Sequence, residues 1–211
     1  KRASPSCGME RVKVHPPKGP AKRVGRGLFA EALLERLPHL PLEEEGRLCD
    51  PRLRENWVER VFAYDAIRRL WDSRWTIGNL VDFHTRYKFT LHAHSEREFR
   101  ELGRLVAVAK SLPRSDLRAR YESGFMSAMK KIATTKKNTN VLQHMLGFFK
   151  NDMDDLSRQE LLAHIEDYRA GLVPLVVPLT LLRHYVRILD VSYLRDQVYL
   201  NPHPKELALR N

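Results

Sequence analysis

Helical periodicity from residue 77 onward constrains the fold more than any other feature of the chain. Between residues 77 and 94, apolar residues recur every three to four positions, a spacing that places them on one face of a helix. They are Leu80, Phe83, Tyr87 and Leu91. Further helices are predicted over residues 96–112, 116–133, 139–150, 158–170, 178–189 and 192–200. Their short connections favour antiparallel neighbours, so we expect an all-α helical bundle of about seven helices.

Two helix starts are explicit in the sequence. Asp50 is a good N-cap and is followed by Pro51, which is favoured at the first helical position. This helix should run to about Trp71. Ser95 and Glu98 have the spacing of a capping box, so a second helix is expected to begin after Ser95.

The first part of the chain has a different composition. Residues 1–27 are rich in Pro, Gly and Lys, and residues 11–15 alternate between charged and apolar side chains in the manner of a short strand. A helix is expected from about Leu28 to Leu37. The run of glutamates at residues 43–45 then precedes the helix start at Asp50.

The positive charge of the chain is concentrated in one region. The 211 residues carry a net charge of +11. Residues 81–150 have 14 basic and 6 acidic side chains, whereas residues 151–211 have 7 and 9. A charge that served only solubility would be spread more evenly, so this region is expected to bind an anionic partner such as a nucleic acid.

Cysteine usage and hydropathy indicate the compartment. Two cysteines, Cys7 and Cys49, and the lack of a signal peptide favour a reducing cytoplasm over a disulfide scaffold. No apolar run reaches the roughly 20 residues that span a bilayer, so we expect no membrane partner. Because the chain starts at Lys1, directly inside a motif-like segment, we expect it to be a fragment of a longer protein.

The candidate nucleic-acid contacts are cations, imidazoles and amides of the basic region. Lysines on both sides of Thr134-Thr135 lead into a helix that is expected to begin near Thr139, and backbone N–H groups at such an end attract anions. The alternative is a solvated cationic loop. The complete set is His84, Arg86, Lys88, His92, Arg118, Arg120, Lys130, Lys131, Lys136, Lys137, Asn138, Asn140, His144 and Lys150.

Two of these assignments have competing interpretations. His84, Lys88 and His92 are spaced four residues apart and share a helical face, but no acidic or cysteine partner stands at a metal-ligand interval. Phosphate contact is therefore favoured over zinc. Aromatic residues of the same region, Phe148 among them, are expected either to stack on bases or to pack in the core.

Several motifs resemble known families. Residues 1–8 (KRASPSCG), 25–29 (GRGLF), 41–48 (PLEEEGRL) and 50–57 (DPRLRENW) resemble the C-terminal half of a TudS-like thiouracil desulfidase domain. Residues 83–88 (FHTRYK), 140–144 (NVLQH), 173–179 (VPLVVPL) and 197–204 (QVYLNPHP) resemble the YbgA-like domain of unknown function. The combination is similar to RudS-type desulfidases, which act on 4-thiouridine in tRNA.

The resemblance implies an organisation and a chemistry. Residues 1–75 would be the partial remnant of an α/β desulfidase domain, and residues 76–211 an all-α domain that binds tRNA. A 4Fe-4S cluster held by three cysteines would accept the sulfur, with Cys7 as one ligand and with catalytic Ser4 or Ser6 beside the substrate. The other two ligand cysteines would lie upstream of Lys1.

Three functions therefore compete. The first is desulfidation of 4-thiouridine in tRNA by the complete protein, in which this chain alone is expected to be inactive. The second is salvage of free thiouracil or of its nucleotide, with the helical domain serving oligomerisation. The third makes the helical domain a protein-interaction module that does not bind RNA.

Overall fold

The computed structural model describes residues 8–9 and 12–207, and most of them are helical. A two-stranded antiparallel sheet of β1 (Val12–Val14) and β2 (Lys22–Gly25) precedes α1 (Leu28–Arg36). Eight further α-helices follow in the described part: α2 (Pro51–Asp72), α3 (Ile77–His94), α4 (Glu96–Ala107), α5 (Arg114–Met129), α6 (Thr135–Leu146), α7 (Asp155–Ala170), α8 (Val176–Ile188) and α9 (Ser192–Arg195). Short 3-10 turns are η1 (Arg47–Cys49), η2 (Ala109–Ser111), η3 (Gly147–Phe149) and η4 (Lys205–Leu207). The predicted mainly α fold with a helical bundle is confirmed.

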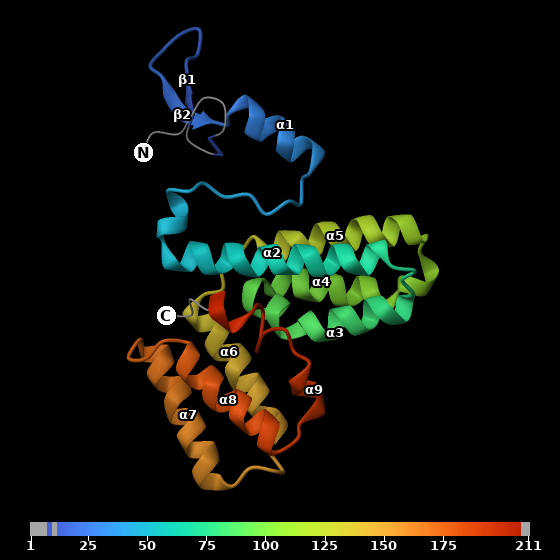
Figure 1. The fold of residues 1–211 in the computed structure, drawn as a ribbon, viewed down its shortest axis with the longest axis vertical. Helices are drawn as coiled ribbons and strands as arrows, with labels where there is room; N and C mark the ends of the chain where they lie inside the picture. The colour runs from blue at the N-terminus through green and yellow to red at the C-terminus, as the bar shows by residue number, and fades with distance from the viewer. Residues whose placement is uncertain (1–7, 10–11, 208–211) are drawn as a thin grey trace.

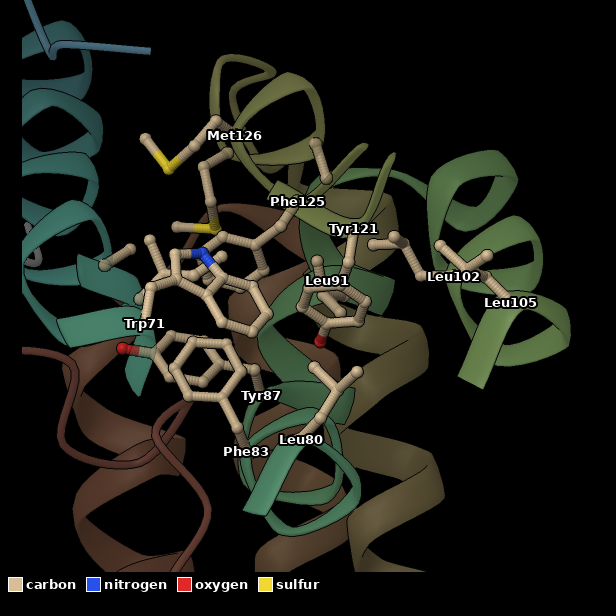
Figure 2. Close-up of a cluster of buried hydrophobic side chains, with 14 of the residues drawn as sticks. Trp71, Leu80, Phe83, Tyr87, Leu91, Leu102, Leu105, Tyr121, Phe125 and Met126 are labelled. Atoms are coloured by element: carbon tan, nitrogen blue, oxygen red, sulfur yellow. The ribbon is translucent and has the colours of Figure 1, made fainter. Parts of the chain in front are cut away.

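The helices form two groups, each around its own hydrophobic core (Figure 1). The first core lies among α2, α3, α4 and α5 and is rich in aromatic rings. Figure 2 shows Trp71 of α2 beside Phe83 and Tyr87 of α3 and Tyr121 and Phe125 of α5. The rings of Phe83 and Phe125 meet edge to face at 5.2 Å between centroids, a favoured aromatic geometry.

The second core lies among α6, α7, α8 and α9, and α3 contributes to it as well. Phe83, Tyr87 and Leu91 of α3 are buried in the first core, whereas Phe89 and Ala93 are buried in the second. Because α3 buries side chains on two of its faces, it is the element that joins the two groups of helices.

Helix α2 belongs to the helical bundle by its packing. Its residues Ala63, Ile67 and Trp71 are buried in the first core, together with Trp75 of the following turn. The sequence-based division had assigned residues 1–75 to the preceding α/β remnant. In the structure, the β1–β2 hairpin and α1 lie beyond α2 at one end of the molecule, so the packing of the bundle begins near Pro51 (Figure 1).

The two predicted helix starts have different outcomes. Asp50 caps α2 as expected, because its carboxylate accepts hydrogen bonds from the backbone N–H groups of Arg52 at 2.8 Å and Leu53 at 3.2 Å. Helix α4 begins after Ser95 as expected, but the capping box is wrong. The Ser95 hydroxyl donates to the side chain of Glu98 instead of accepting from the backbone.

The lysine-rich connection is shorter than predicted. Helix α6 begins at Thr135 rather than near Thr139, because the side chain of Thr134 accepts a hydrogen bond from the backbone N–H of Lys137. Lys136 and Lys137 therefore lie in the first helical turn. Among the described residues, no helix combines the length and the apolar character that a membrane span needs.

We expect Phe89→Ala to destabilise the whole helical region. Phe89 is 1% exposed, and truncation of a buried phenylalanine costs about 3–5 kcal/mol of unfolding free energy. Urea unfolding followed by circular dichroism measures the loss. Leu156→Ala is the control, because Leu156 is 78% exposed and its truncation should change the free energy by less than about 0.5 kcal/mol. Two separate transitions in the wild type would contradict the role of α3 as a shared element.

Candidate nucleic-acid interface

Five rings from five different elements form a row on one side of the bundle. The row, called the aromatic row below, consists of Phe99 (α4), His92 (α3), His144 (α6), Phe148 (η3) and Tyr193 (α9). The centroids of neighbouring rings lie 5.2, 6.3, 6.3 and 5.1 Å apart along the row. Its two end pairs are stacked, with interplanar angles of 24° and 13°.

The aromatic row is partly open to solvent and is supported from below. Phe148 is 37% exposed, and His144 is also exposed. Phe89 underlies the row and contacts the rings of His144, Phe148 and Tyr193 at 5.8, 6.0 and 6.4 Å between centroids. Since Phe89 belongs to the second core, the row is fixed to the interior of the fold.

Cations and an amide lie beside the imidazole of His92. Burial lowers the pKa of His92, while Glu96 raises it and His144, Arg100 and Lys88 lower it further. The ring therefore favours its neutral form at neutral pH. The amide nitrogen of Asn140 lies 3.4 Å from Nε2 of His92. A neutral imidazole beside cations provides a flat stacking surface within a positive field.

The structure thus brings together four residues of the sequence-based set. Lys88, His92, Asn140 and His144 gather around the aromatic row. Sequence reasoning had named Phe148 but had missed Phe99, Arg100 and Tyr193 as parts of this surface. Tyr193 in particular lies in a short helix remote in sequence, and no local pattern connects it with α3 and α6.

His84 does not fit its predicted role as a cationic phosphate contact. Nδ1 of His84 lies 3.0 Å from the hydroxyl of Tyr121, which is fully buried. Burial, with a smaller effect of Lys88, lowers the pKa of His84 to about 4. His84 is therefore neutral at pH 7 and belongs to the edge of the first core.

Three of the four predicted lysines, Lys130, Lys131 and Lys137, donate hydrogen bonds to groups within the protein. Nζ of Lys131 lies 2.7 Å from Oε2 of Glu98. Nζ of Lys137 donates to the backbone carbonyl of His94 at 2.7 Å, at the C-terminal end of α3. The four lysines therefore do not form one phosphate-binding cluster.

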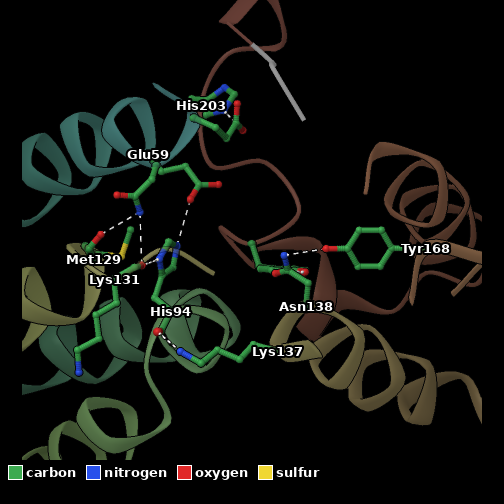
Figure 3. Close-up of polar contacts among 11 residues, drawn as sticks. Glu59, His94, Met129, Lys131, Lys137, Asn138, Tyr168 and His203 are labelled. Carbon is green, nitrogen blue, oxygen red and sulfur yellow. Dashed lines mark hydrogen bonds and ion pairs between the residues drawn. The ribbon is translucent and has the colours of Figure 1, made fainter. Parts of the chain in front are cut away.

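Asn138 is also held inside the protein. It is 6% exposed, its Nδ2 donates to the hydroxyl of Tyr168 at 3.1 Å, and its Oδ1 accepts from the hydroxyl of Tyr199 at 3.1 Å. Nearby, the imidazole of His94 lies 3.1 Å from the carboxylate of Glu59 (Figure 3). Asn138 consequently ties α6 to the C-terminal segment and is not part of the exposed surface.

The remaining predicted contacts lie on several sides of the bundle. Arg118 lies over the ring of Trp71 at 5.7 Å, and Arg120 pairs with Asp116 at 3.4 Å. The other three are exposed: Arg86, Lys136 and Lys150. Lys130 is exposed, and its Nζ donates to the carbonyl of Pro38 at 3.4 Å.

The predicted catalytic and cluster residues cannot be placed. Ser4, Ser6 and Cys7 lie outside the described residues. Cys49 is free and exposed at the end of η1. Within residues 8–9 and 12–207, no group of three or more His, Cys, Asp or Glu side chains is arranged to hold a metal ion.

Comparisons with known proteins give two findings. The model of a family described as a protein of unknown function (DUF1722) matches residues 88–204. The uncharacterized protein YbgA of Escherichia coli (strain K12) is 34% identical over 161 residues, which cover 76% of this chain and 95% of that protein. No solved structure matches.

We expect Glu98→Gln to remove an acid-sensitive part of the stability. Burial raises the pKa of Glu98, but hydrogen bonds from Lys131 and Ser95 outweigh it and lower the pKa from 4.5 to about 2. The ionised carboxylate therefore stabilises the fold above pH 4.5, and this contribution is lost as the pH falls toward 2. The variant should be less stable by about 1–2 kcal/mol at pH 7.

The pH dependence separates this effect from a general loss of packing. The melting temperatures of wild type and Glu98→Gln should converge between pH 4.5 and 2. A gap that stays constant over this range would contradict the assignment. Glu101→Gln is the matched control, because Glu101 pairs with Arg97 at an exposed site and should show little effect.

Proposed function

We propose that the helical domain of this chain, which belongs to the DUF1722 family of proteins of unknown function as its YbgA-like resemblance predicted, binds tRNA. The observation that carries the proposal is the aromatic row with Lys88 and Arg100 beside it. Single-stranded RNA segments are recognised by stacking of unpaired bases on aromatic side chains, combined with cations for the phosphates.

The distribution of charge supports the same surface. Residues 81–150 carry 14 basic and 6 acidic side chains, and they provide four of the five rings of the row. Bases of a loop or of the unpaired end of tRNA would stack on the exposed rings of the row, His144 and Phe148. The choice of tRNA rests on the resemblance of the motifs to RudS-type desulfidases.

The enzymatic part of the proposal concerns the complete protein. The motifs of residues 1–57 support a desulfidase that removes sulfur from 4-thiouridine, with Cys7 as one ligand of a 4Fe-4S cluster and with Ser4 or Ser6 beside the substrate. The chain has two cysteines, and three are needed. The residues present here do not supply the ligands of the cluster.

Replacing a ring of the aromatic row should weaken RNA binding. Phe148→Ala removes one stacking surface, and loss of base stacking costs about 1–3 kcal/mol, which corresponds to roughly five- to 150-fold weaker affinity. Fluorescence anisotropy with labelled tRNA at near-physiological salt measures it. Phe29→Ala is the matched control, because Phe29 is 64% exposed but lies on α1. Equal losses for both variants would exclude the row as the binding surface.

Replacing a cation beside the row should change the salt dependence of binding. Lys88→Gln removes one expected phosphate contact, so the slope of log affinity against log salt should flatten by about 0.7–0.9. Lys110→Gln, on an exposed side chain of η2, is the control and should leave the slope unchanged. If wild-type protein binds no tRNA at all, a protein-interaction role takes the place of this proposal.

The desulfidase activity is tested with a longer protein that carries the two further ligand cysteines implied by the resemblance and a reconstituted cluster. The near-ultraviolet absorbance of 4-thiouridine in tRNA should disappear on incubation, and Cys7→Ser should abolish the loss. Activity on free thiouracil but not on tRNA would favour the salvage alternative. Unchanged absorbance with both substrates would refute the desulfidase assignment.

A further inference from the structure

A cavity, called the interhelix cavity below, lies between the two groups of helices. It has a volume of about 130 Å³ and is lined by residues of α2, α3, α6 and α7, of the α5–α6 connection and of the C-terminal segment. An apolar cavity of about 150 Å³ in a protein core holds one benzene molecule, so the interhelix cavity has room for a single six-membered ring. Glu59, His94, Asn138 and Tyr168 belong to its walls (Figure 3).

The hydroxyl of Thr90 is an unsatisfied polar group on the wall of this cavity. Thr90 is 2% exposed, and its Oγ1 has no hydrogen-bond partner among the described residues. Two other helical threonines, Thr139 and Thr180, donate to the carbonyl four residues earlier at 2.9 and 2.7 Å. The carbonyl four residues before Thr90, that of Arg86, accepts the backbone N–H of Val198 at 3.0 Å. A buried hydroxyl without a partner costs free energy, and a ligand in the cavity recovers it.

The hydroxyl of Tyr168 is a second donor on the same wall. It accepts a hydrogen bond from Nδ2 of Asn138 at 3.1 Å, which leaves its own hydrogen for an acceptor. Tyr199, which also lines the cavity, donates to Oδ1 of Asn138 at 3.1 Å. Asn138 therefore fixes two aromatic rings of the wall. Aromatic walls with a few placed hydroxyl donors favour a planar ligand that carries a carbonyl oxygen.

Two carboxylates line the cavity, and each shares a proton with a histidine. The imidazole of His94 has Nδ1 at the carbonyl of Lys131 and Nε2 at 3.1 Å from Glu59. His203 repeats this arrangement, with Nδ1 at 3.0 Å from the carbonyl of the next residue and Nε2 at 3.0 Å from Glu55. Because a carbonyl only accepts hydrogen bonds, Nδ1 carries a hydrogen in both rings, and a further proton lies between Nε2 and the carboxylate.

Each of these two pairs is uncharged as a whole. The charges of the acid and the histidine add to zero whether the shared proton is on the imidazole or on the carboxyl group. Arg52 is the other charged residue of the lining, and it is exposed. Since burial of a charge without a partner is costly, the interior of the cavity favours an uncharged ligand.

We propose that the interhelix cavity binds an uncharged planar ring that bears a carbonyl group, such as a free nucleobase or nicotinamide. The ring packs beside Tyr168 and Tyr199, and its carbonyl oxygen accepts a hydrogen bond from Thr90. The site is separate from the aromatic row, because His92 is two positions from Thr90 and from His94, and residues two apart on a helix point in different directions. The inference therefore does not depend on the proposed binding of tRNA.

Saturation-transfer NMR on the whole chain measures the binding of uracil and of nicotinamide. At least one of them should bind, and the one that binds assigns the ligand to the nucleobases or to the aromatic amides. Orotate and nicotinate are the matched controls, because they carry a carboxylate on the same rings, and their affinities should be at least about tenfold weaker. Equal affinity of a ring and its charged counterpart overturns the proposal, and so does a lack of binding of both uncharged rings.

Thr90→Val tests the unsatisfied hydroxyl. Valine has a similar shape, so the free protein should melt at the wild-type temperature or higher, whereas the affinity for the ring should fall about two- to tenfold. Thr180→Val is the matched control, because Thr180 is a helical threonine that does not line the cavity, and it should keep the affinity. An undiminished affinity in Thr90→Val would place the ligand elsewhere and overturn the site.

Tyr168→Phe provides a second test that does not alter α3. It keeps the aromatic ring, removes the hydroxyl donor and should weaken binding of the ring by a similar factor. Unchanged affinity in this variant counts against the site in the same way. Phe148→Ala separates the two proposals, because it should weaken tRNA binding and leave the affinity for the small ring intact.

Discussion

The burial of α3 on two faces is the constraint on which the helical domain depends. Phe83, Tyr87 and Leu91 pack with α2, α4 and α5, whereas Phe89 and Ala93 pack with α6, α7, α8 and α9. Polar contacts at the end of α3 reinforce this position, because Lys137 of α6 donates to the His94 carbonyl. Since both cores use the same helix, the relative placement of the two helix groups follows from side-chain packing along α3.

The proposed RNA surface is a product of the same packing. His92 of α3 and His144 of α6 become neighbours only because the two helices lie side by side, and Phe89 supports His144, Phe148 and Tyr193 from below. The cations beside this surface lie outside the core. Rigid rings are suited to stacking with bases, and the positive field of the neighbouring cations is suited to phosphates.

The sequence predicted the fold well because helix periodicity and caps are local signals. The start of α2 at Pro51 and the span of α3 followed from such signals. The capping box at Ser95 did not form, because the Ser95 hydroxyl donates to Glu98. Helix α6 begins earlier than predicted, because the side chain of Thr134 caps it. Site residues were harder to predict. The charge of a side chain did not show that Lys131 pairs with Glu98 whereas Lys136 lies on the exposed surface. The burial of Asn138 depends on Tyr168 and Tyr199, which are far from it in the sequence.

The position of Phe89 beneath the aromatic row limits how this surface can evolve. Replacement of His144, Phe148 or Tyr193 alters a contact of Phe89, which also belongs to the second core, so a change in these stacking surfaces also changes the stability of the fold. The cations beside the row, Lys88 and Arg100, belong to neither hydrophobic core, so their replacement leaves the core contacts in place. On the proposed RNA surface, substitutions at the charged margin should therefore cost less stability than substitutions of the rings that contact Phe89.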